Sequence, residues 1–182
     1  MSLDSITLKI STPTEQLAPG RGFYQLEEDI LYVQIGKFSS ERKFYSYIES
    51  ESLRLDIDKS GYLIFLEYKI PRRQWPVDDK FSLPKTIESA DLRWIDFRER
   101  VGDPVVVTNK LRTKICFRFS DKPPKYSFYL AESVFLQMDK NDHLVAIWID
   151  DITDDIAGKE IAAFRKKVRG RNSFFRKPAH LK

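Results

Sequence analysis

Residues 51–68 read ESLRLDIDKSGYLIFLEY, and residues 132–149, which begin 81 positions later, read ESVFLQMDKNDHLVAIWI. When Tyr45–Tyr68 is aligned with Tyr126–Ile149, 8 of 24 positions are identical without a gap. Most other positions exchange similar residues, such as Leu53 for Val134. An internal repeat of this kind indicates that one structural unit occurs twice along the chain.

Each of the two segments has the pattern of a β-hairpin. Leu53, Leu55 and Ile57 alternate with polar residues, which is the period of a half-buried strand. Residues 58–61 are a good turn, because Asp can bond the turn backbone and Gly tolerates a positive φ. Residues 62–69 are apolar on both faces, so the sequence predicts that this returning strand is central and covered on both sides.

The remaining strand patterns complete two β units. We predict a first β repeat over residues 1–70, a proline-containing connection over 71–90, and a second β repeat over 91–150. The fold prediction is a mainly β protein, with two tandem β-meander repeats related by a pseudo-twofold axis and packed as a sandwich or barrel. The predicted strands outside the first hairpin are residues 5–10, 30–35, 44–48, 92–97, 104–108, 113–119, 125–130, 133–139 and 143–149.

After Asp150 the apolar period changes, and residues 151–182 form a helix and tail in this prediction. Thr153 can act as an N-cap, and the two aspartates that follow it suit the positive end of a helix dipole. Apolar residues then recur at spacings of 4, 3 and 4, at Ala157, Ile161, Phe164 and Val168. This pattern predicts one amphipathic helix over about residues 154–168 that covers a sheet.

The 182 residues are 42% hydrophobic, which is enough to fill the core of one ordinary domain or two small ones. We find no apolar run long enough for a membrane span and no secretion signal, so we expect a cytoplasmic protein without membrane contact. The single cysteine excludes an internal disulfide and any site built from several thiolates. No cofactor motif is present in the sequence, and we predict no cofactor.

The net charge of +4 is unevenly distributed along the chain. The last 18 residues hold eight cations and no acid, which leaves 23 basic against 27 acidic residues in residues 1–164. Cations interleaved with two phenylalanines can hold phosphates while the rings stack on bases, or the segment can dock on the acidic body or on a neighbouring subunit. The residues predicted to contact nucleic acid or a partner are Arg165, Lys166, Lys167, Arg169, Arg171, Phe174, Phe175, Arg176 and Lys177.

Residues 24–33, YQLEEDILYV, are followed by LDIDKSGYL at residues 55–63 and by Glu67. These motifs resemble a family of short bacterial domains of unknown function, whose pattern combines a Tyr-Asp-x-Glu-x-Asp-x-Leu-Tyr-Ile strand with an Asp-x-Asp-Gly turn and a Gly-Ile-Glu-Ile strand. The resemblance covers residues 24–70 and departs at Gln25, where the family has Asp, and at Phe65, where it has Gly. What it implies is a small β-rich unit, here duplicated, and no particular reaction.

Two acidic stretches raise the question of a metal site. Asp56, Asp58, Ser60 and Glu67 fall at positions 1, 3, 5 and 12 of a calcium-binding EF-hand loop, but that loop requires flanking helices and this segment has strand periodicity. Hairpin chemistry alone explains the acidic turn. Four aspartates at 150, 151, 154 and 155 could likewise hold a divalent ion, although capping of the predicted helix also explains them.

The sequence offers few catalytic residues. His143 lies in the second turn and His180 in the basic tail, and we interpret both as surface histidines. Cys116 shares a strand face with Lys114 and Arg118, which could lower the pKa of its thiol, but without a third group it is better read as structural.

The connection contains Arg72, Arg73 and Trp75, residue types that are frequent at interaction hot spots. Two interpretations stay open: an exposed recognition loop, or a tryptophan that plugs the connection onto the core.

The function predicted from the sequence is a non-enzymatic binding or assembly module that contacts a protein partner or a second copy of itself. The first alternative is a nucleic-acid-associated protein that uses the basic tail. The second is an enzyme with a carboxylate-lined or metal-dependent site, for which Glu67 is an ionisable group at a core-facing strand position.

Overall fold

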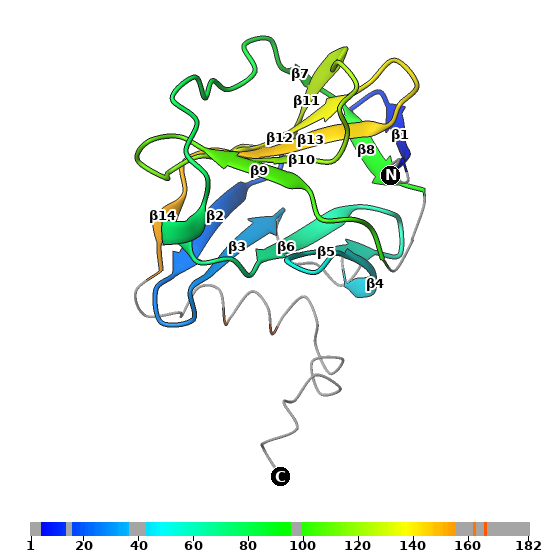
Figure 1. Cartoon of the computed structure of the whole chain (residues 1–182). Coiled ribbons are helices and arrows are strands. Elements are labelled where there is room, and N and C mark those ends of the chain that lie inside the picture. Colours follow the sequence, from blue (N-terminus) through cyan, green and yellow to red (C-terminus); the bar gives the residue numbers. More distant parts are fainter. Residues whose placement is uncertain are drawn as a thin grey trace.

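The computed structural model describes residues 5–13, 16–36, 43–95 and 100–155, together with Ala162 and Lys166. The described part is mainly β and forms two six-stranded sheets that lie one above the other, with a two-stranded sheet beside them (Figure 1). The predicted mainly β fold class is thereby confirmed.

The first sheet has the strand order β14-β2-β3-β6-β5-β4. All pairings in it are antiparallel except that of β14 with β2, which is parallel. Its strands are Gly20–Gln25 (β2), Ile30–Ile35 (β3), Phe44–Glu49 (β4), Leu53–Asp58 (β5), Leu63–Tyr68 (β6) and Thr153–Asp154 (β14).

The second sheet has the order β7-β11-β12-β13-β10-β9, and its β7–β11 pairing is parallel. Its strands are Glu88–Ser89 (β7), Val105–Thr108 (β9), Ile115–Arg118 (β10), Tyr126–Ala131 (β11), Val134–Met138 (β12) and Leu144–Ile149 (β13). The small sheet pairs Leu8–Ser11 (β1) with Asp91–Trp94 (β8), and a single 3₁₀ turn, Arg72–Gln74 (η1), follows β6.

The predicted meander is wrong at one connection in each sheet. A meander would place β3 beside β4, but β3 pairs with β6, and likewise β10 pairs with β13 rather than with β11. All six residues of β6 and all six of β13 are buried, whereas β4 is mostly half-buried. The most apolar strands therefore take the central places and the more polar strand goes to the edge, which is a Greek-key type of connection.

The predicted helix start at residue 154 is also wrong. Thr153 and Asp154 are extended and pair with Phe23 and Tyr24 of β2, and the backbone N–H of Asp155 donates to the Tyr24 carbonyl (2.9 Å). An open edge of β2 offers hydrogen-bond partners to this backbone, and that tertiary contact outweighs a local capping preference. Ala162 and Lys166 are helical and exposed, and the rest of the predicted helix and tail lies outside the described residues.

The main core lies between the two large sheets. Its members alternate along the strands, as Leu31 and Val33 do on β3 and Leu53, Leu55 and Ile57 do on β5. The ring of Tyr68 meets that of Phe117 edge-on across the sheets, with centroids 4.9 Å apart. Smaller apolar clusters cover the outer face of each sheet.

Helices contribute little to the described part of the chain. None of those within it is long and apolar enough to cross a lipid bilayer.

Candidate functional site

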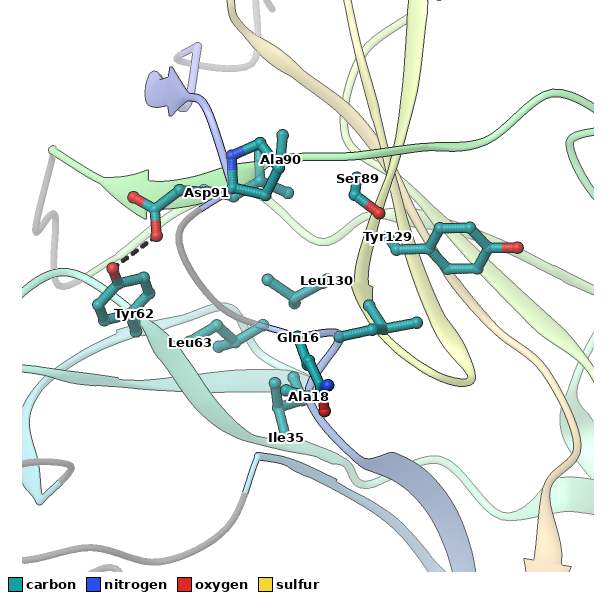
Figure 2. Close-up of a pocket in the computed structure, with 13 residues that line it drawn as sticks. Gln16, Ala18, Ile35, Tyr62, Leu63, Ser89, Ala90, Asp91, Tyr129 and Leu130 are labelled. Atoms are coloured by element: carbon teal, nitrogen blue, oxygen red, sulfur yellow. Dashed lines mark hydrogen bonds between the residues drawn. The ribbon is translucent and has the colours of Figure 1, made fainter.

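A pocket opens where the three sheets meet. Its cavity has a volume of about 90 Å³. Figure 2 shows Ile35, Leu63 and Leu130 around the centre of the pocket, whereas the ring of Tyr129 points away from them. The lining residues are Pro13, Gln16, Leu17, Ala18, Ile35, Tyr62, Leu63, Ser89, Ala90, Asp91, Leu92, Tyr129 and Leu130.

One side of the pocket carries a compact polar network. The Tyr62 hydroxyl donates to Asp91 Oδ1 (2.6 Å), and Arg93 Nε donates to Asp91 Oδ2 (2.9 Å). The guanidinium of Arg93 also lies over the Tyr62 ring, 4.7 Å from its centroid. Burial and the hydrogen bond to Asp91 raise the pKa of Tyr62, so its hydroxyl stays protonated at neutral pH and acts as a donor.

The hairpin turn before β6 places Tyr62 beside Asp91. Asp58 Oδ1 accepts the backbone N–H groups of Ser60 and Tyr62, both at 2.9 Å, which closes the turn. The backbone N–H of Trp94 then donates to the Gly61 carbonyl (2.7 Å) and holds β8 against the turn. The approach is so close that a Cβ at residue 61 would lie 2.6 Å from the Trp94 carbonyl oxygen. Glycine, with φ of 92°, is therefore required here.

The size of the pocket limits what it can hold. Sites for small molecules usually measure about 300–1,000 Å³, and one water molecule takes about 30 Å³ of liquid volume. A cavity of about 90 Å³ has room for a few waters or for one small side chain. Its mixed lining, apolar at the centre and polar at Tyr62 and Asp91, suits a side chain with an apolar body and a polar tip.

The residues of the EF-hand pattern have separate tasks in the structure. Asp58 holds the turn, and Asp56 accepts from Arg54 Nε (2.8 Å) on the outer face of the first sheet. Glu67 lies on the same outer face, opposite Arg54 in the strand register, so its predicted core-facing position is wrong. Among the described residues, no group of three or more His, Cys, Asp or Glu side chains is arranged to hold a metal ion.

The four C-terminal aspartates also do not converge. Asp150 pairs with Lys114, which directly precedes β10, and Asp154 pairs with Arg72 of η1. Asp151 has a positive φ of 51° in the bend between them, and Asp155 is buried. These ion pairs tie residues 150–154 to the segment before β10 and to η1.

The predicted recognition loop packs against the body. Trp75 is 1% exposed, its indole N–H donates to the Ile70 carbonyl (2.8 Å), and its ring meets Tyr24 edge-on. Arg72 lies over the Tyr24 ring, 4.1 Å from its centroid, and Arg73 pairs with Asp29 (3.3 Å). The position of Trp75 corresponds to the second of the two interpretations, a plug of the connection onto the core.

The remaining sequence candidates lie apart from the pocket. Cys116 is fully buried, and burial raises the pKa of its thiol to about 12, with the charge of Arg118 opposing the shift. His143 Nδ1 lies 3.3 Å from Asp139 Oδ2 in the second turn. Within the basic tail only Lys166 is described, and its side chain is exposed, while His180 lies outside the described residues.

Sequence reasoning missed the Tyr62, Asp91 and Arg93 network because Tyr62 lies 29 residues before Asp91 and meets it only through the contact of β8 with the turn. One signal was present. Asp91 and Arg93 are two residues apart on a strand pattern and so share a face, which could have indicated their ion pair.

Compared with known proteins, the chain matches no family model, and no curated protein is significantly similar to it in sequence. The resemblance of residues 24–70 to short bacterial domains of unknown function stays a prediction.

Proposed function

We propose that the protein is a non-enzymatic binding module, and that the pocket at the junction of the sheets receives one side chain of a protein partner. The observation that carries this proposal is an open cavity with an apolar centre and a fixed polar network on one side. Both oxygens of Asp91 already accept hydrogen bonds, and the pKa of Tyr62 is raised away from neutrality. The pair therefore suits recognition better than proton transfer, which needs a pKa near the working pH.

A rim substitution tests this proposal. Leu17 lines the pocket and is 42% exposed, so Leu17→Asp places a charge at the mouth with little effect on folding. Leu111→Asp is the matched control, because Leu111 is 78% exposed and lies outside the pocket. The wild type, the control and Leu17→Asp are each used to capture proteins from an extract of the source cells. Any protein that binds the wild type and the control but not Leu17→Asp is then purified, and its direct binding to each variant is measured. If every captured protein is retained by Leu17→Asp, the pocket is not the binding site.

The tail supports a second candidate, a nucleic-acid-associated function. Eight cations and no acid in the last 18 residues favour phosphate contacts. This alternative predicts copurifying nucleic acid and a salt-sensitive affinity that disappears when residues 165–182 are deleted. Assembly through the tail would instead produce a smaller species in solution when Phe174 and Phe175 are changed to Ser.

We also propose that the C-terminal segment covers the outer face of the first sheet as an amphipathic helix. Phe23, Tyr32, Ile64 and Phe65 on that face are at most 5% exposed, and β14 ends beside β2 at the same sheet. Ala162 and Lys166, one helical turn apart, are exposed, which puts the apolar positions 157, 161, 164 and 168 on another side of such a helix. Phe164→Asp should then lower the free energy of unfolding by about 2–4 kcal/mol; an unchanged value would contradict the proposal.

We further propose that the two large sheets are two copies of one unit that exchange their first strands. The strand order β4-β5-β6-β3-β2 of the first sheet corresponds strand for strand to the order β11-β12-β13-β10-β9 of the second sheet. A backbone N–H of β8 bonds the turn of the first unit (Trp94 to Gly61, 2.7 Å), and one of β1 bonds the turn of the second (Leu8 to Asp142, 3.1 Å). Leu8 and Trp94 pair with each other in the small sheet.

Separating the units tests this exchange. A cut between Trp75 and Pro76 keeps Trp75 with Tyr24 and Tyr68, its partners in the first unit, and keeps Phe81 with the second. Fragments 1–75 and 76–182 should each fail to unfold cooperatively alone and should form a folded 1:1 complex when coexpressed. Cooperative unfolding of either isolated fragment would argue against exchanged strands.

A further inference from the structure

A second concave site lies away from the pocket, at the turn of the β12–β13 hairpin. It is a groove of about 630 Å³, within the usual range for small-molecule sites. One wall is the segment Lys122–Lys125, which contains two consecutive prolines, and the other is the turn segment Asp139–Asn141. The site belongs to the second sheet only.

The walls of the groove are held in place by the backbone. The N–H of Lys125 donates to the Met138 carbonyl (2.8 Å), which ties the proline segment to β12. Asp139 Oδ1 accepts the N–H groups of Asn141 (2.8 Å) and His143 (3.0 Å), which closes the turn. Pro123 and Pro124 have fixed φ angles, so little ordering is needed when a ligand binds.

The groove carries a positive charge. Lys122, Lys125 and Lys140 line it, all three are exposed, and within the described part of the chain none of them forms an ion pair. The Nζ of Lys125 lies 5.2 Å from the centroid of the Tyr126 ring, which is 39% exposed. Tyr126 itself does not line the groove and its ring stacks on Phe128, so what the groove offers a ligand is its lysine ammonium groups, which suit phosphate.

The single acid of the groove does not cancel this charge. Asp139 is 2% exposed, and its carboxylate is directed to the turn amides and to His143, 3.3 Å away, with the charge of Lys122 also acting on it. Its one negative charge leaves a surplus of two positive charges when the three lysines are protonated. The neighbouring acids Asp121 and Asp142 do not line the groove.

The equivalent region of the first sheet differs. Lys59 corresponds to Lys140, but Lys125 is replaced by Phe44, and the pair of prolines has no counterpart in Arg42 and Lys43. The residues that form the groove are therefore not repeated in the sequence of the first hairpin.

We propose that the groove at Lys122, Lys125 and Lys140 binds a phosphorylated ligand of nucleotide size. The shared chemistry is two or more neighbouring phosphate groups held by lysine point charges. Such phosphates belong either to a free nucleotide or to the backbone of a nucleic acid. The site is independent of the pocket, so each proposal can fail without the other.

The test uses the full chain and three probes: pyrophosphate, ATP and a single-stranded oligothymidylate. Titration calorimetry measures each affinity, and amide chemical shifts locate the binding. The triple variant Lys122→Gln/Lys125→Gln/Lys140→Gln should weaken binding of pyrophosphate and ATP at least about tenfold. The control Lys59→Gln/Lys85→Gln/Lys110→Gln removes the same charge from exposed lysines elsewhere and should change the affinity less than about twofold.

The three probes separate the sources of phosphate. Tighter binding of ATP than of the oligonucleotide, with shifts at residues 122–126 and 139–141, supports a free nucleotide. Tighter binding of the oligonucleotide with the same shifts supports a nucleic-acid backbone. The proposal is overturned if none of the three probes binds the wild type, if the shifts occur elsewhere, or if both triple variants lose affinity equally.

Discussion

The two hairpin turns, Asp58–Gly61 and Asp139–Asp142, use the same hydrogen bonds but differ at their last residue. In each, the aspartate Oδ1 accepts two backbone N–H groups, at 2.9 Å twice in the first turn and at 2.8 and 3.0 Å in the second. The last residue has a positive φ in both, 92° at Gly61 and 61° at Asp142.

The difference lies in the strand that packs on each turn. Gly61 is buried, and β8 approaches so closely that no Cβ fits, whereas Asp142 is exposed and its turn accepts a longer hydrogen bond from Leu8 (3.1 Å). The acidic residue therefore makes the turn, and the close approach of a neighbouring backbone decides whether glycine is needed.

The outer faces of the two sheets carry different residues at corresponding positions. Glu67 and Asp56 on the first sheet correspond to Trp148 and Gln137 on the second. Trp148 donates to Gln137 Oε1 (2.8 Å), and its ring meets Phe81 of the connection edge-on. The connection therefore supplies the apolar cover of the second sheet, while the first sheet carries ion pairs between Arg54, Glu49 and Asp56 at the corresponding positions.

The largest loss of stability is expected when a residue on the outer face of the second sheet is replaced by its counterpart on the first. Trp148→Glu removes a ring that is 9% exposed and leaves a carboxylate beneath Phe81, so the free energy of unfolding should fall by about 3–5 kcal/mol. Urea denaturation measures this loss. Trp148→Phe, which retains an aromatic ring, should lose less than half as much; equal losses would show that Gln137 rather than packing is the important partner.

Gly61→Asp gives the first turn the residue of the second. The added Cβ would lie 2.6 Å from the Trp94 carbonyl oxygen and would also require a positive φ, so the expected loss is about 2–4 kcal/mol. Thermal and urea unfolding provide the measurement. A loss below about 0.5 kcal/mol would mean that β8 can move away from the turn at little cost.

Asp58→Ala and Asp139→Ala remove the same pair of N–H acceptors from the two turns. Each variant should lose about 1–3 kcal/mol, and the two losses should be similar. Chemical denaturation of both variants side by side tests the correspondence. A loss confined to one turn would show that the shared hydrogen bonds do not have a shared role.

Acid should weaken the second turn. Burial alone would raise the pKa of Asp139, but the N–H groups of His143 and Asn141, with the charges of His143 and Lys122, outweigh it and lower the pKa below its usual 3.8. The stabilisation is therefore present above the unfolded pKa and is lost as the pH falls through the folded one. Between about pH 6 and about pH 3, the free energy of unfolding should fall less in Asp139→Asn than in the wild type. Identical pH profiles of the two proteins would contradict this role of Asp139.

The smallest effect is expected for Asp142→Gly. The substitution relieves a positive φ of 61° and removes an exposed side chain, so stability should change by less than about 1 kcal/mol in either direction. Melting temperature is a sufficient measurement. A large loss would mean that the Asp142 side chain has a role beyond the turn.

Much of the local structure could be predicted from the sequence, because a period of two along a strand depends only on neighbouring residues. The alternation of Leu53, Leu55 and Ile57 identified the core face of β5, and the apolar residues of β6 indicated its central position. The pocket was not predictable in this way, because Tyr62 reaches Asp91 only after β8 has docked on the turn. The sequence left two interpretations open for Trp75, because a tryptophan beside arginines suits both an exposed interaction hot spot and a ring packed on the core; the structure buries it.

The sequence by itself determined that strands form and that an aspartate begins each hairpin turn. It also determined which side chains of β5 face the core, whereas it placed Glu67 of β6 on the wrong face. Only the tertiary structure decided that β3 pairs with β6, that Thr153 and Asp154 extend along β2, and that Gly61 lies against Trp94. The physical reason is that the unpaired N–H and C=O groups at a strand edge can form hydrogen bonds with any extended backbone that lies beside them. The packing of the whole chain decides which backbone segment lies there.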